Sequence, residues 1–122
     1  MKELILVCAG SFFGGGARYL LSKTVESLWT SGFPWATLTV NVIGCFLIGL
    51  LSALFVDGQL SSTAKWGLMS GFCGGFTTFS TFMNDNWSLG HDGQLLSAFL
   101  YTSASFAIGL FALFLGYYLV KQ

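Results

Sequence analysis

The sequence predicts an all-α membrane protein with four transmembrane helices, the third of which is broken. Hydrophobic residues make up 54% of its 122 residues and charged residues only 8%, whereas a soluble domain carries about 25% charged residues. A spanning helix needs roughly 20 apolar residues, so the chain has room for four spans and short loops. One apolar stretch contains a segment rich in glycine, hydroxyl residues and phenylalanine, residues 71–82, which departs from a plain spanning helix.

We expect one domain over residues 1–122, with spans at about residues 4–21, 35–56, 64–87 and 95–120. A polar linker separates the first two spans, and Pro34 suits the first turn of the second. Asp57 and Gly58 end the second span, and a polar turn precedes the fourth. The first span has no small-residue cleavage site and carries Arg18 in its second half, so we expect it to be retained rather than removed as a signal peptide.

The third span contains Gly71, Gly74 and Gly75, and four hydroxyl side chains follow them. Lipid offers no partner to a broken helix, so irregular backbone at this depth is stable only where it is buried in protein or lines a wet cavity. We therefore expect this segment to hold or pass an ion. Unwound backbone carbonyls are hard oxygen ligands for a cation such as Na⁺, and the structural alternative is a kink that only shapes the helix for packing.

Phe79 and Phe82 are three residues apart and share a helix face. An aromatic ring has a positive edge, and ring edges at a dry constriction could stabilise an anion weakly enough to let it leave. Two phenylalanines at this spacing are also common in a plain core. The neighbouring hydroxyls of Thr78, Ser80 and Thr81 favour the ion pathway, because hydrophobic packing does not need them.

Polar side chains in the other spans have two interpretations each. An arginine within a span is costly in lipid; Arg18 either places positive charge at a vestibule that gathers anions or extends to the membrane surface. Asn41 offers two N–H donors, which could bind an anion or bond a neighbouring helix. Tyr101 and Ser105 share a face of the fourth span and either continue a polar track or contact another helix.

The charges around the spans are almost balanced. The side with the termini has Lys2, Lys65 and Lys121, and the other side has Arg18 and Lys23. The difference in the number of Lys and Arg residues between the two sides sets the orientation of a membrane protein. Three residues against two is a small difference, so we expect the chain to insert in both directions. Two copies of one sequence could then form an antiparallel dimer. The formal net charge is zero, and the sequence has no cluster of basic residues that would bind nucleic acid.

Several classes of protein fit the sequence less well. A small proton-coupled multidrug exporter would need a carboxylate within a span as its proton relay, and no Asp or Glu lies in an unbroken apolar stretch. A single loop histidine, His91, and three cysteines without paired spacing give no catalytic or metal cluster, so we do not expect an enzyme. A non-transporting membrane assembly subunit is the remaining alternative.

At these residues the chain resembles the CrcB/Fluc family of fluoride ion channels. The resemblance covers nearly the whole chain and is carried by Gly14–Tyr19, Thr37–Asn41 and, most specifically, Gly71–Phe82. It implies a fluoride-selective channel of the cell membrane, built as an antiparallel dual-topology dimer with two pores and one central structural Na⁺. Some family members are heterodimers of two paralogues, whereas the presence of Asn41, Phe79 and Phe82 in one chain favours a homodimer.

The resemblance also implies roles for individual residues. The backbone carbonyls of Gly74 and Thr77 would bind the Na⁺. The resemblance further implies a vestibule arginine at Arg18, a pore asparagine at Asn41, pore phenylalanines at Phe79 and Phe82, and a fourth-span polar track at Tyr101 and Ser105. After Phe82 the family typically reads Ser-x-Glu, whereas this chain reads Met83-Asn84-Asp85, so it lacks one hydroxyl and has a shorter carboxylate at the outer end of the track.

Overall fold

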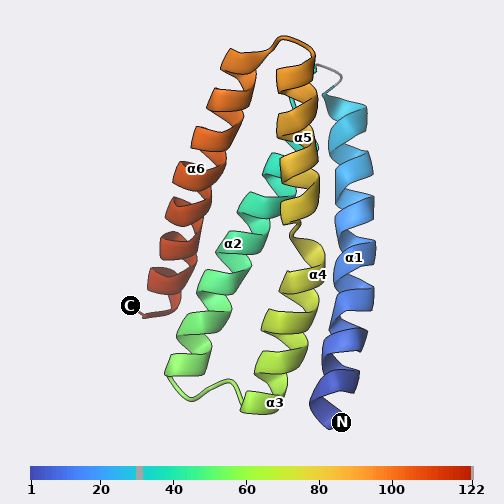
Figure 1. Ribbon diagram of the computed structural model, residues 1–122. Helices are drawn as coiled ribbons and strands as arrows, with labels where there is room; N and C mark the ends of the chain where they lie inside the picture. The colour runs from blue at the N-terminus through green and yellow to red at the C-terminus, as the bar shows by residue number, and fades with distance from the viewer. Residues whose placement is uncertain (30–31, 122) are drawn as a thin grey trace.

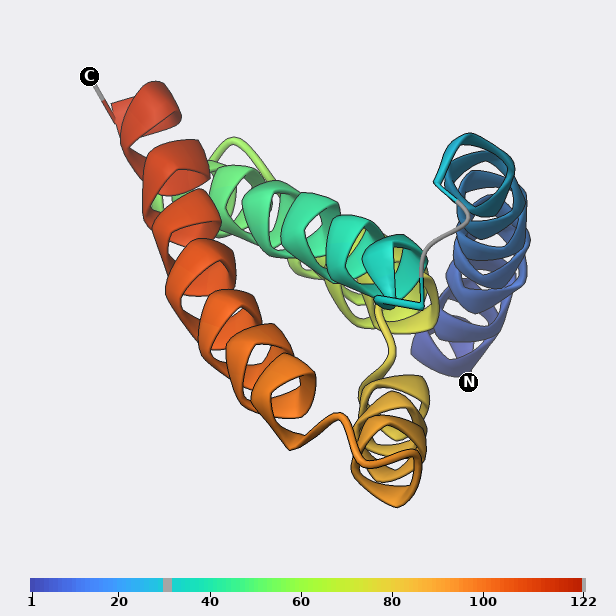
Figure 2. The ribbon, with the colours of Figure 1, turned by 90° about the horizontal axis from the view of Figure 1, so that it is seen from above.

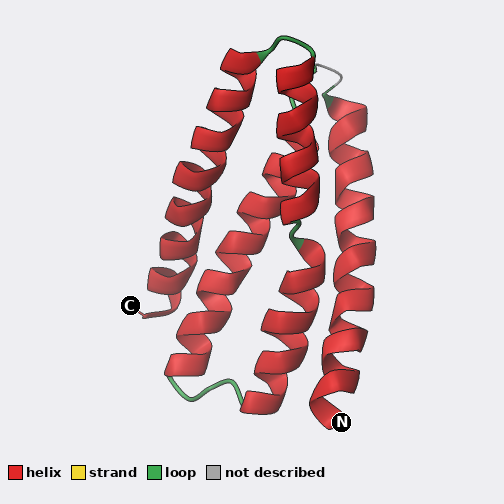
Figure 3. Cartoon of the chain, viewed as in Figure 1, coloured by secondary structure: helices red, strands yellow, loops and turns green. Residues whose placement is uncertain are grey.

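The computed structural model describes residues 1–29 and 32–121, and all regular secondary structure within these ranges is helical. This confirms the predicted all-α class (Figures 1 and 3). The three long helices are α1 (Lys2–Leu28), α2 (Trp35–Val56) and α6 (Leu95–Lys121). Between α2 and α6 the chain forms four shorter elements: α3 (Ser62–Lys65), the π-helix η1 (Trp66–Cys73), α4 (Gly74–Phe76) and α5 (Phe79–His91).

Among the described residues, α1, α2 and α6 are long and apolar enough to cross a membrane. The elements from α3 to α5 follow one another along the same length of the molecule, so they form a broken column beside α1 and α2 (Figure 1). Seen from above, α2 lies between α1 and α6, and α5 stands apart from α4 (Figure 2). The residues between α4 and α5, where the column steps sideways, belong to the candidate site described below.

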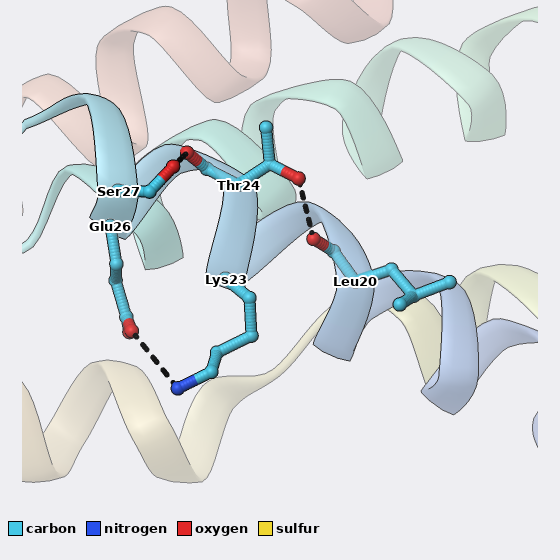
Figure 4. A network of polar contacts seen from close by, with 5 residues as sticks. All are labelled: Leu20, Lys23, Thr24, Glu26 and Ser27. Atoms are coloured by element: carbon cyan, nitrogen blue, oxygen red, sulfur yellow. Dashed lines mark hydrogen bonds and ion pairs between the residues drawn. The ribbon is translucent and has the colours of Figure 1, made fainter.

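The helix α1 extends through Leu28, beyond the predicted end of the first span at Leu21. Its last turns contain a network of polar contacts (Figure 4). The Thr24 hydroxyl donates to the carbonyl of Leu20 at 2.9 Å, and the Ser27 hydroxyl donates to the carbonyl of Thr24 at 2.7 Å. These local bonds satisfy the hydroxyls within the helix itself, so the polar linker can continue it.

Glycines allow two pairs of helices to pack with their backbones in close contact. A Cβ atom at Gly14 of α1 would collide with the backbone of Phe72 in η1, and one at Gly75 of α4 would meet the backbone of Ser11. Similarly, a Cβ at Gly49 of α2 would collide with the carbonyl of Leu113 in α6. Small residues at helix contacts are typical of membrane bundles, where van der Waals packing drives association.

The buried cluster lies where α5 meets α2 and α6. It consists of Leu38, Phe82, Leu89 and Tyr101, with Phe33, Val42 and Ala98 packed around it. Many large apolar side chains elsewhere are exposed, among them Phe12 on α1 and Leu96 on α6. Such extensive apolar exposure is expected of helices that face acyl chains or a second copy of the chain.

Candidate functional site

The third predicted span is interrupted at Thr77 and Thr78. Thr77 (φ −87°, ψ 162°) and Thr78 (φ −150°, ψ 121°) have extended backbone between α4 and α5. The predicted interruption within residues 71–82 thus falls on the two threonines and not on the glycines, since Gly74 and Gly75 are helical. The physical reason is that Gly75 is needed for the close approach of α1, while Thr78 caps the next helix by accepting a hydrogen bond from the Thr81 amide at 3.2 Å.

Asn41 binds both backbone groups of Thr78. Its Nδ2 donates to the Thr78 carbonyl at 3.0 Å, and its Oδ1 accepts from the Thr78 amide at 2.9 Å. One side chain thus satisfies both backbone groups of Thr78 at the interruption, where lipid offers no partner. Of the two roles considered for Asn41, bonding to a neighbouring helix is observed, and Nδ2 still carries a second N–H.

The interruption also leaves the last carbonyl groups of the helix before it without their helical donors, and those of Gly74 and Thr77 are among them. In an unbroken helix the Thr78 amide would donate to the Gly74 carbonyl, and the Thr81 amide would donate to the Thr77 carbonyl. Here these amides donate to the side chains of Asn41 and Thr78 instead. The Gly74 and Thr77 carbonyls are therefore free of their helical donors, and their oxygens have the chemistry that a hard cation such as Na⁺ requires.

The Arg18 side chain reaches from α1 to α4, the last helical element before the interruption. Its Nε donates to the Gly75 carbonyl at 3.1 Å in a partly buried position. The last carbonyls of a helix carry partial negative charge, so the guanidinium stabilises this end electrostatically as well as through the hydrogen bond. Arg18 thus faces the broken column rather than lipid, a contact that the sequence did not indicate. A vestibule role for this charge stays a prediction.

A cavity of about 510 Å³ lies between α2, the interruption, α5 and α6. Its wall includes five of the predicted pathway residues, which come from three separate segments: Asn41, Thr78, Phe79, Phe82 and Ser105. Thr77 also lines it, beside small or apolar residues such as Gly44 and Ile48. The cavity is therefore mostly apolar with a few polar groups at defined positions, which is the usual composition of a selective binding site.

The two phenylalanines of the wall have different surroundings. Their ring centroids are 6.1 Å apart, yet Phe79 is 70% exposed and Phe82 is 6% exposed. Phe82 packs against Tyr101 at 5.0 Å and presents an edge contact with Phe106 at 6.3 Å. Core packing within one chain therefore accounts for Phe82 but not for Phe79, whose ring is held at the cavity without burial.

Three predicted pathway residues do not line this cavity. Ser80 and Thr81 are exposed on α5, and Tyr101 is fully buried behind Phe82. The Tyr101 hydroxyl donates to Asp85 Oδ2 at 3.0 Å. The sequence analysis placed Asp85 at the outer end of the polar track but did not predict that it accepts a hydrogen bond from Tyr101.

A π-helix was not expected at Trp66–Cys73. π-Helical turns are rare and often occur at functional sites. Here η1 packs along α1, where the Ser11 hydroxyl donates to the Gly71 carbonyl at 3.3 Å. The sequence carries no recognisable signal for this wider turn.

Comparison with known proteins gives consistent similarities over nearly the whole chain. The family model described as "CrcB-like protein, Camphor Resistance (CrcB)" matches residues 5–117. A Chlorobaculum tepidum protein named "Fluoride-specific ion channel FluC" is 49% identical, covering 99% of this chain and 96% of the relative. Proteins of the same name from Thermus thermophilus and Flavobacterium psychrophilum are 43% and 38% identical, covering 96% and 100% of this chain and 94% and 99% of the relatives.

Proposed function

The chain belongs to the CrcB family, and from this premise we propose that it is a fluoride-selective channel of the cell membrane. It lets cytoplasmic fluoride leave down its electrochemical gradient. Fluoride enters an acidified cell as HF and is trapped inside as the anion, so a passive pore driven by the negative interior lowers fluoride toxicity. The observation that carries the proposal is the cavity in which Asn41, Thr78, Phe79, Phe82 and Ser105 meet.

Selectivity for fluoride follows from the groups on the cavity wall. Fluoride is strongly hydrated, so passage requires donors that replace its water. The second N–H of Asn41, the hydroxyls of Thr78 and Ser105, and ring edges from Phe79 and Phe82 supply such contacts. No single strong site is present among them, which suits conduction, since an ion must leave as readily as it enters. Chloride is larger and fits such a path poorly.

The channel works as an antiparallel dual-topology dimer. Near-balanced charges around the spans support insertion in both directions. The exposed ring of Phe79 at the cavity, and the exposed Phe106 and Leu110 on its wall, support a second copy that covers this side. Asn41, Phe79 and Phe82 occur together in this chain, so a homodimer is self-sufficient, and a paralogous heterodimer is the alternative.

We propose further that a structural Na⁺ binds to the released carbonyls of Gly74 and Thr77. Each copy would supply both oxygens, giving four hard ligands at the dimer axis. Gly74 is exposed, and a Cβ built on it meets nothing within 4 Å, so the neighbourhood has room for an ion and a facing copy. When bound, the cation supplies positive charge that holds two backbone interruptions together.

A flux measurement on the purified protein tests the function. We expect liposomes that contain the protein to release fluoride to an ion-selective electrode when a potential is applied, and to retain chloride in the same assay. A non-transporting assembly subunit would release neither ion. A proton-coupled multidrug exporter would instead move drugs in response to a pH gradient. Well-folded protein that passes no fluoride would contradict the proposed function.

A further inference from the structure

A line of aromatic rings connects the α1–α2 linker with the cavity wall. The ring of Phe33, in the linker, stands edge-on to the ring of Tyr101, with centroids 5.6 Å apart and an interplanar angle of 84°. The Tyr101 ring in turn contacts Phe82 at 5.0 Å. Phe82 lines the cavity, whereas Phe33 and Tyr101 do not. The contacts between these rings give Phe33 a path to the cavity wall through Tyr101 and Phe82.

Tyr101 couples the position of the Phe33 ring to the position of the Phe82 ring. Its side chain is fully buried, its hydroxyl is fixed to Asp85, and its ring lies between Phe33 and Phe82. Protein interiors are close-packed, so a ring held on every side cannot turn unless a neighbour moves. Phe33 is the outermost member of this group and packs against the buried cluster around Phe82.

The backbone of the linker fixes Phe33 in turn. Phe33 is followed by Pro34, whose ring restricts the backbone. The Phe33 carbonyl accepts a hydrogen bond from the Trp35 amide at 2.8 Å, and the Trp35 ring contacts the Phe33 ring at 4.6 Å. These contacts with Trp35 hold the Phe33 ring against Tyr101.

We propose that Phe33 is a positioning residue for fluoride passage, which acts by fixing the orientation of the Phe82 ring through Tyr101. The proposal rests on the proposed function. Orientation matters because the edge of an aromatic ring attracts an anion and its face repels one. If the Phe82 ring turned within the cavity wall, the attraction between the wall and fluoride would weaken, although the residues of the wall would stay the same.

The competing explanation is that Phe33 only anchors the linker to the core by apolar contact. In that case any apolar side chain of similar volume would serve, since volume-conserving exchanges are usually tolerated. Phe33→Leu separates the two explanations because it keeps apolar bulk but removes the ring. Phe33→Tyr keeps the ring. Phe12→Leu is a matched control, since Phe12 is 75% exposed on α1 and contacts Phe13 rather than the cavity.

Two readouts should be taken on the full-length protein in liposomes. The first is the fluoride efflux rate; we expect Phe33→Leu to lower it by about threefold to tenfold, as loss of an aromatic pair implies. Phe33→Tyr and Phe12→Leu should stay within about twofold of the parent, a range smaller than the effect of one aromatic pair. The second readout is the ¹⁹F resonance of 4-fluorophenylalanine incorporated only at position 82, which should shift or broaden in Phe33→Leu and in neither other variant.

The second readout does not depend on transport. An unchanged ¹⁹F resonance in Phe33→Leu would overturn the proposal, as would equal losses of efflux in Phe33→Leu and Phe33→Tyr. A parent protein that passes no fluoride would refute the proposed function instead, and the ¹⁹F resonance would still decide whether Phe33 positions the Phe82 ring.

Discussion

Replacing Asn41 with aspartate exchanges the Nδ2 amino group for an oxygen and alters nothing else in size or shape. In the structure this group donates to the Thr78 carbonyl, while Oδ1 accepts from the Thr78 amide. Asn41→Asp keeps the second bond and turns the first into a contact between two oxygens. It also places a negative charge on the wall of a cavity that we propose to conduct an anion.

The magnitude follows from the lost bond and the unsatisfied carbonyl. Hydrogen bonds between membrane helices average about 0.6 kcal/mol, and a buried group left without a partner costs about 1–3 kcal/mol. We therefore expect the observed geometry of the interruption to be destabilised by about 1–3 kcal/mol. A change of about 1.4 kcal/mol in free energy corresponds to a factor of ten. If this whole cost falls on the conducting geometry, fluoride efflux should decrease by between about fivefold and about 150-fold, and further from charge repulsion.

The assay is fluoride efflux from liposomes, combined with thermal unfolding in detergent. Gln59→Glu is the matched control, because it makes the same change from amide to carboxylate in the exposed turn after α2. It should leave both efflux and the unfolding temperature unchanged. If Asn41→Asp conducts fluoride as well as the parent, the assignment of Asn41 to both the interruption and the path is wrong.

Three further predictions address the rings, the cation and the dimer. Phe82→Ile should reduce fluoride efflux by about tenfold or more, since it removes the ring edge, while gel filtration still shows a dimer; unchanged efflux would refute the role of the ring. Crystals grown with a heavier monovalent cation should show an anomalous peak beside Gly74 on the dimer axis, and a map without that peak would remove the site. A reporter fused to the terminus after Lys121 should be found on both sides of the membrane in cells, whereas a single orientation would contradict dual insertion.

The fold class could be predicted because composition leaves the chain few choices. A chain this apolar must satisfy its backbone internally in lipid, and helices do so within one segment. The existence of an interruption was predicted from the same argument, applied to a segment rich in glycine and threonine. Its position was not, because it depends on the contact of Gly75 with α1 and on the bonds from Asn41 to Thr78.

The candidate site could be predicted in part for a similar reason. Asn41 stands out as a residue type that an apolar span does not need, and Phe79 and Phe82 stand out only through the hydroxyl residues beside them. All three line the cavity. Tyr101 looked equivalent in the sequence, yet it lies behind Phe82. Spacing along α6 indicates which residues share a face, but the angle at which α5 meets α6 decides which of them reaches the cavity.

The backbone contact between α1 and the broken column determines which positions of α1 can vary. Glycines there leave no room for even one methyl group at Gly10 or Gly14, whereas the large rings of Phe12 and Phe13 project away from the rest of the chain. Gly10 and Gly14 are consequently hard to replace, whereas a Cβ at Gly15 or Gly16 of the same helix would meet nothing within 4 Å. The exposed face of α1 can thus change in sequence without disturbing the distance over which Arg18 reaches Gly75.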